Sequence, residues 1–227
     1  ISHNVASGLG GGVLAVAAVG AITDNTMSAN TATQGGGLYL SYGSSDVVSG
    51  NVVTNNTATT SEAGGGIGID VDSYPTITSN DIEDNTYALA GSGALPNDLT
   101  TATSAGTTIN ATNNWWGTTN VIASHVWDDV QNSALGVVTD SPFLTATIAL
   151  PDLAVVSTAN PPSVAKAGEL ISVASTVTNL GAGQASASTI GYYLQLTTST
   201  ERVKLIGVQE VVNLSSGAST TVQGRVR

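Results

Sequence analysis

The sequence predicts an all-β protein in which a right-handed parallel β-helix is followed by a partial immunoglobulin-like β-sandwich. Three observations predict this order. A motif containing Asn recurs at intervals of 26 and 29 residues. The apolar runs within each copy are far shorter than the ~10–12 residues of a typical helix. All five Lys and Arg residues lie after position 151. We therefore expect β-helix repeats in residues 1–118, a closing segment and linker in 119–150, and the sandwich in 151–227.

The repeat follows the pattern Φ-x-x-N-x-Φ-x-x-N-T, where Φ is an apolar residue. Three segments match it without gaps: 22–31, 48–57 and 77–86. Residues 1–4 match part of an earlier copy, and we expect a degenerate copy from Ile109. The pattern places Asn at six positions, which are Asn25, Asn51, Asn80, Asn30, Asn56 and Asn85.

Glycine triplets at 10–12, 35–37 and 64–66 each precede a short alternating strand. No apolar run of this length can bury one side alone, so the units must stack on one another. We expect coils of three strands, each strand pairing in parallel with the next coil about 4.8 Å away. Glycine should supply a positive φ at one corner, and Asn should adopt the left-handed conformation at the other two.

The Asn columns have two interpretations. Identical Asn side chains stacked in register bond to one another as amide ladders. Alternatively, the amides form a row that binds sugars. We favour the ladder and assign the six Asn residues a structural role.

The repeats of residues 1–118 resemble the parallel β-helix repeat family of the pectate-lyase-like superfamily, which includes carbohydrate-binding and sugar-hydrolase modules. This resemblance implies the fold more strongly than it implies an activity. Stacking of the short apolar runs independently requires the same architecture.

One later segment resembles the N-N-W-W-G signature that closes the β-helix of many bacterial and archaeal surface proteins: Asn113, Asn114, Trp115, Trp116 and Gly117. In those proteins an acidic residue and Pro-Phe-Leu follow, as do Asp128, Asp129 and residues 142–144 here. Independently, two large aromatic side chains can cover the apolar end of a solenoid, which needs an atypical terminal unit.

The segment after residue 150 contains five strand-like runs, at 153–156, 170–178, 190–196, 203–212 and 220–226. Turn signals separate them, which is typical of a β-sandwich. Residues 151–153, 177–183 and 214–217 resemble the cell-adhesion-related domain of bacteria, abbreviated CARDB. An immunoglobulin-like sandwich usually needs about 100 residues, so we expect the last strand or two to be missing.

The resemblance raises the alternative of a polysaccharide lyase or hydrolase. A lyase needs a cation as base, or to stabilise developing negative charge. Residues 1–150 contain no Lys or Arg, which leaves only His3 and His125. A His without a positioned partner is more often structural than catalytic. We therefore expect no catalytic residue in this chain.

Asp70 and Asp72 are the best paired carboxylates. A spacing of two on a strand would place both on the outer face, opposite Ile69 and Val71. Such a pair could hold Ca²⁺, although we favour solvated carboxylates because no neighbouring repeat carries an equivalent acid. Apart from Ca²⁺ we expect no cofactor. Tyr39, Tyr42 and Tyr74 are too scattered to define a sugar-binding track.

Charge and composition limit the function further. Five basic residues against 16 acidic ones give a net charge of −11, which argues against nucleic-acid binding. Cysteine is absent, so disulfides and thiolate metal sites are excluded. The longest apolar stretch, Val13 to Ile22, is about half of a membrane span, so we expect no membrane insertion.

We therefore expect a structural or adhesive segment of an extracellular or cell-surface prokaryotic protein. Its partners would be an extracellular polysaccharide or a surface protein, bound weakly. The alternative is the non-catalytic part of a polysaccharide-active enzyme (a lyase, hydrolase or epimerase) whose active coils lie upstream.

Overall fold

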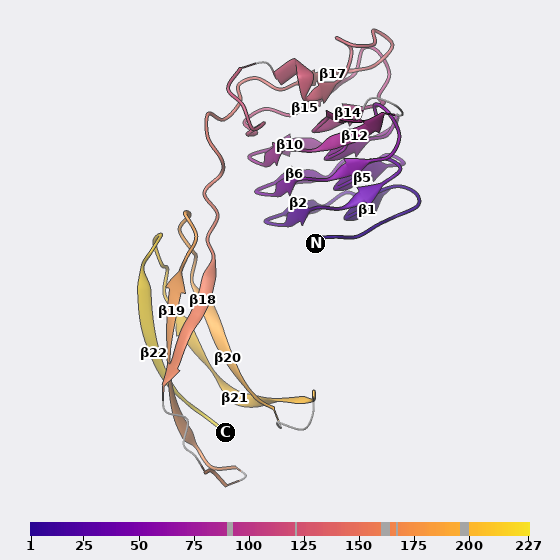
Figure 1. The fold of residues 1–227 in the computed structure, drawn as a ribbon. Helices are drawn as coiled ribbons and strands as arrows, with labels where there is room; N and C mark the ends of the chain where they lie inside the picture. Colours follow the sequence, from indigo (N-terminus) through magenta and orange to yellow (C-terminus); the bar gives the residue numbers. More distant parts are fainter. Residues whose placement is uncertain (90–92, 121, 160–163, 167, 196–199) are drawn as a thin grey trace. The chain divides into compact units, whose positions relative to one another are not determined.

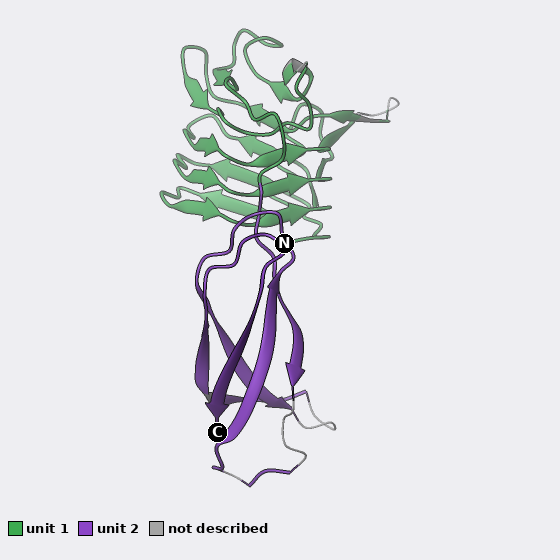
Figure 2. Ribbon diagram, turned by 90° about the vertical axis from the view of Figure 1, so that its left-hand side faces the viewer, with its two compact units in different colours: residues 1–148 green, residues 149–227 purple. Residues whose placement is uncertain are grey.

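The computed structural model describes residues 1–227 except 90–92, 121, 160–163, 167 and 196–199. The chain forms two compact units, residues 1–148 and 149–227 (Figure 2). Both are built almost entirely of strands, which confirms the predicted all-β class.

The first unit is a solenoid whose complete coils each contribute four short strands (Figure 1). The first coil contains β1 (Val13–Val16), β2 (Ala21–Thr23), β3 (Thr26–Ser28) and β4 (Thr31–Ala32). The second contains β5 (Leu38–Ser41), β6 (Val47–Ser49), β7 (Val52–Thr54) and β8 (Thr57–Ala58). The third contains β9 (Ile67–Ile69), β10 (Thr76–Thr78), β11 (Asp81–Glu83) and β12 (Thr86–Leu89).

The chain then forms β13 (Gly93–Pro96), β14 (Leu99–Thr101), β15 (Thr108–Asn110), the short 3₁₀ helix η1 (Ile122–Ser124), β16 (Val126–Trp127) and β17 (Val137–Thr139). β16 and β17 extend two of the sheets, so the coils continue beyond residue 118.

Equivalent strands stack into parallel sheets: β1-β5-β9-β14-β16, β2-β6-β10-β15-β17 and β3-β7-β11. Pairing is in register, because Val48 lies opposite Ile22 on one side and Ile77 on the other. A fourth sheet, β4-β8-β12, carries β13 antiparallel at its edge.

Each complete coil has four strands, whereas we expected three. The fourth strand begins directly after the second Asn of the repeat, and the glycine triplet that opens the same coil passes close to it. A Cβ on Gly36 would lie 2.6 Å from the backbone nitrogen of Thr57. Glycine therefore allows the segment at the start of each coil to lie against this strand, a role that we did not predict.

The left-handed glycine that we expected at one corner is present, as at Gly35 (φ 61°), but the left-handed residues at the other two corners differ from the prediction. They directly precede the Asn columns, as at Asp24 (φ 56°), Gly50 (φ 69°) and Ser79 (φ 58°), whereas the repeat Asn residues themselves have ordinary φ values. The physical reason is that each repeat Asn must direct both its N–H and its side chain at the next coil, so the bend falls one residue earlier.

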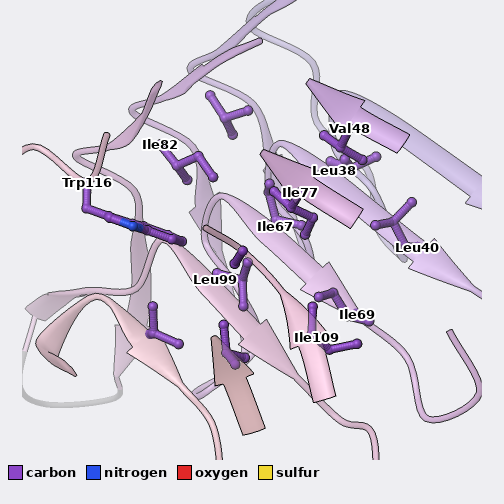
Figure 3. Packing of buried hydrophobic residues seen from close by; sticks show 14 of the residues in the cluster. Leu38, Leu40, Val48, Ile67, Ile69, Ile77, Ile82, Leu99, Ile109 and Trp116 are labelled. Carbon is purple, nitrogen blue, oxygen red and sulfur yellow. The ribbon is translucent and has the colours of Figure 1, made fainter. Parts of the chain in front are cut away.

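Apolar side chains from every coil fill the solenoid interior (Figure 3). Val48 and Ile77 from one sheet, and Leu38 and Ile67 from another, are fully buried. Stacking of similar side chains makes the core continuous from coil to coil, so no single coil has to bury its own face.

The second unit contains two antiparallel sheets. One is formed by β18 (Leu153–Ala159), β19 (Ile171–Asn179) and β22 (Ser219–Val226), and the other by β20 (Ser188–Gln195) and β21 (Arg202–Val211). These strands match the five predicted runs, apart from the end of the third, which lies outside the described residues. Val177, Val211 and Leu214 form part of the buried core.

Candidate functional site

Two columns of Asn side chains run through the solenoid. In the first column, the backbone N–H and Nδ2 of Asn51 both donate to Oδ1 of Asn80, each at 2.9 Å. Asn25 donates to Asn51 in the same way, and Asn80 donates to Asn114. Nδ2 of Asn51 also donates to the carbonyl of Ile22, at 2.7 Å. The buried amides are therefore satisfied within the scaffold.

The second column passes from Asn4 through Asn30 and Asn56 to Asn85. It ends differently from the first. The backbone N–H of Asn85 donates to Oδ1 of Asp98 at 3.0 Å, and Nδ2 of Asn85 donates to the same oxygen at 2.8 Å. A carboxylate thus takes the place of the next Asn.

Asp98 occupies a position that is glycine in the earlier coils. Leu99 pairs with Ile67, so Asp98 lies in register with Gly66. A Cβ on Gly66 would come within 2.8 Å of Nδ2 of Asn85, its own coil's ladder residue. Asp98 itself supplies the side chain that the ladder needs at this level.

His125 lies in register with Asp98 on the following coil. Its Nδ1 is 2.5 Å from Oδ2 of Asp98, and its carbonyl accepts the backbone N–H of Asp98 at 2.7 Å. The Asp98 side chain is fully buried, whereas the His125 side chain is 21% exposed. The pair therefore joins the interior of the ladder to the surface.

The surroundings of Asp98 and His125 raise the pKa of both side chains. The hydrogen bond with Asp98 raises the pKa of His125, although partial burial opposes it, and the charge of Asp84 adds to the increase. Burial raises the pKa of Asp98 despite hydrogen bonds from His125 and Asn85. A His oriented by a buried carboxylate is one component of acid–base catalysis. The same pair also ends the second Asn column, because Asp98 accepts the hydrogen bonds of Asn85.

A cavity of about 320 Å³ lies near this pair. Six of its lining residues are Tyr87, Leu95, Pro96, Asn97, Trp127 and Gln131. The hairpin β12–β13 supplies one wall, and β16 with the turn after it supplies another. Both apolar and polar side chains line the cavity.

The carboxylates Asp70 and Asp72 do not share a strand face. β9 ends at Ile69, so both lie in the turn that follows, and our spacing argument does not apply. Oδ2 of Asp70 accepts a hydrogen bond from Ser41 Oγ at 2.9 Å, while Asp72 is exposed. No group of three or more acidic or His side chains suited to a metal occurs among the described residues. Calcium binding at this pair stays a prediction.

The N-N-W-W-G residues lie against the third coil. Asn114 is the last member of the first Asn column, Trp116 is fully buried, and Trp115 Nε1 donates to Glu83 at 3.0 Å. Asn113 and Gly117 both have a positive φ. The N–H of Leu144 donates to the carbonyl of Asn114 at 2.9 Å, so the Pro-Phe-Leu segment contacts this motif.

The tyrosines that we considered for sugar stacking are dispersed. Tyr39 is 6% exposed, and burial together with Asp70 raises its pKa to about 12. Its ring lies against Gly68, where a Cβ would come within 2.6 Å. Tyr42 and Tyr74 are exposed. None of the three lines the cavity.

Residues 1–135 match the family model described as a right-handed β-helix region. The chain belongs to this family. Residues 150–226 of the β-helix chain match the CARDB family model, which confirms the predicted order of domains. No curated protein and no solved structure matches it. In the described part of the chain, no helix has the length and hydrophobicity of a transmembrane segment.

Sequence reasoning considered His125 but missed its partner. The signal can be read only once the strand register is known: the triplet before each strand ends in Gly at positions 12, 37 and 66, and the pairing of Leu99 with Ile67 places Asp98 at the matching position. An acid at a position otherwise restricted to glycine indicates that its side chain has acquired a role.

Proposed function

We propose that this β-helix chain is a structural and adhesive segment of an extracellular or cell-surface prokaryotic protein. The solenoid would act as a stiff spacer and the CARDB unit as the adhesive module. One observation carries the proposal: the repeated polar side chains of the solenoid bond to one another along its axis. Asn51 and Asn56, for example, are fully buried and fully engaged by neighbouring coils.

The CARDB family is related to cell adhesion, and its unit offers apolar surface for a partner. Leu194 and Val203 are each more than half exposed, and they pair directly across β20 and β21, so their side chains share one face. Contiguous exposed apolar side chains commonly mark protein interaction sites. This supports a protein partner for the second unit.

An adhesion assay tests the proposal. Beads coated with the full chain are exposed to extracellular polysaccharide and to prokaryotic cells, and retained beads are counted against albumin-coated beads. In parallel, soluble chain is incubated with neutral and acidic polysaccharides, and reducing or unsaturated sugar ends are measured. We expect retention without sugar release.

Two outcomes would contradict the proposal. One is retention no greater than that of albumin beads. The other is sugar release that His125→Gln abolishes, because the pair with Asp98 would then be catalytic and the alternative of a polysaccharide-active enzyme would be favoured.

A further inference from the structure

The cavity beside the last coils has the size and form of a small binding site. Its volume of about 320 Å³ lies at the lower end of the ~300–1,000 Å³ range of ligand cavities. A space of this size suits one small ring rather than a folded peptide.

Its walls combine flat apolar surfaces with amide groups. Tyr87 lies opposite Leu95 in the β12–β13 hairpin, and the partly exposed Trp127 faces the cavity from β16. Asn97 and Gln131 add amides to the lining. A sugar ring has the matching chemistry, because its C–H groups pack on an aromatic face while its hydroxyls bond to polar groups.

The walls are held in place before any ligand arrives. Tyr87 pairs with Ala58 of the neighbouring coil, and Trp127 pairs with Thr100. Gln131 Oε1 accepts the backbone N–H of Asp128 at 3.0 Å. A preformed site loses less conformational entropy on binding, which favours affinity.

Charge determines which sugars fit. Residues 1–148 carry twelve Asp and Glu residues and no Lys or Arg. Asp128 and Asp129 lie close to the cavity in the chain, next to Gln131 in the same turn region. A uronate would bring a carboxylate to this surface, where no Lys or Arg can pair with it and Asp98 already engages His125, so an uncharged sugar is favoured.

We propose that this cavity binds one uncharged sugar residue of a neutral polysaccharide, with the ring stacked on Trp127. The inference rests on the proposed adhesive function and names a ligand for its solenoid. The proposed glycan contact lies at the β12–β13 hairpin and β16, not on the Asn columns.

Calorimetric titration of the full chain tests the proposal, with cellohexaose, xylohexaose and mannohexaose as neutral probes and hexagalacturonate as the charged probe. We expect saturable one-site binding of at least one neutral probe, with hexagalacturonate at least tenfold weaker. Trp127→Ala should weaken neutral binding at least tenfold, and Trp127→Phe should retain it within about threefold. Tyr74→Ala, an exposed aromatic outside the cavity, is the matched control and should bind like the parent.

The proposal is overturned if no neutral probe binds, if hexagalacturonate binds equally well, or if the folded Trp127→Ala chain binds like the parent. Thermal unfolding of each variant shows whether it is folded. Bead retention distinguishes the two proposals: adhesion that persists in Trp127→Ala, through the CARDB unit, leaves the adhesive function intact even when the sugar site is wrong.

Discussion

Asn85 donates two hydrogen bonds to a single oxygen of Asp98, at 3.0 and 2.8 Å. The other oxygen of that carboxylate lies 2.5 Å from Nδ1 of His125. Asp98 is therefore both the final member of an amide ladder and half of an ionisable pair. A substitution can separate the two roles, because Asn at position 98 can still accept the hydrogen bonds of Asn85 but cannot ionise.

Asp98→Asn and Asp98→Ala should destabilise the solenoid to different extents. Ala removes the acceptor of two buried donors of Asn85, at a cost of about 1–3 kcal/mol for each unsatisfied group. Asn restores an acceptor at Oδ1, as at Asn114 in the other column, so the free energy of unfolding should fall less. Chemical denaturation measures both. Equal losses would show that the ladder contact contributes nothing.

The pair should make stability dependent on pH. The pKa of His125 is raised in the folded state, so its stabilisation is complete below its ordinary value near 6.5 and disappears as the pH rises through the folded value. The raised pKa of Asp98 has the same sign, because it also lowers the free energy of unfolding as the pH rises above the ordinary Asp value of 3.8. The free energy of unfolding should thus fall above pH 6.5 more steeply in the parent than in His125→Gln. Parallel pH profiles for the two proteins would contradict this.

Ala29 tests the left-handed position that precedes each ladder Asn. Its φ is 53°, a conformation that costs a non-glycine residue roughly 1–2 kcal/mol. Ala29→Gly should therefore raise the free energy of unfolding by about 0.5–1 kcal/mol, after allowing for the entropy of glycine in the unfolded chain. Ala21→Gly, on an exposed strand position with ordinary φ, is the control and should lower it by a similar amount. Destabilisation by both changes would refute the strain argument.

The sequence predicted the scaffold well because stacked coils repeat the same residue at the same level. The Asn positions, the apolar runs and the change of composition near 151 could all be seen in one chain. The left-handed corner was placed one residue too late, since the known tolerance of Asn for that conformation competed with its role as a ladder donor and acceptor.

The repeat pattern does not predict the pair of Asp98 and His125. The β12–β13 hairpin lengthens the interval before the fourth coil, so Asp98 no longer aligns with the glycine triplets by simple spacing. His125 reaches it only because β16 pairs with β14 across a long segment without the motif. Side chains brought together by such pairing are not visible as a local pattern.

The central claim is that the Asn columns are scaffold and not a binding surface. Asn51→Ala tests it most directly, because both donors of Asn25 would lose their acceptor and Oδ1 of Asn80 would keep only the backbone N–H of residue 51. The account predicts a loss of about 1–3 kcal/mol in the free energy of unfolding. Exposed Thr26→Ala should change it by no more than about 0.5 kcal/mol, and binding of neutral oligosaccharide should persist in both folded variants. An Asn51→Ala chain that unfolds like the parent but no longer binds the sugar would contradict the account.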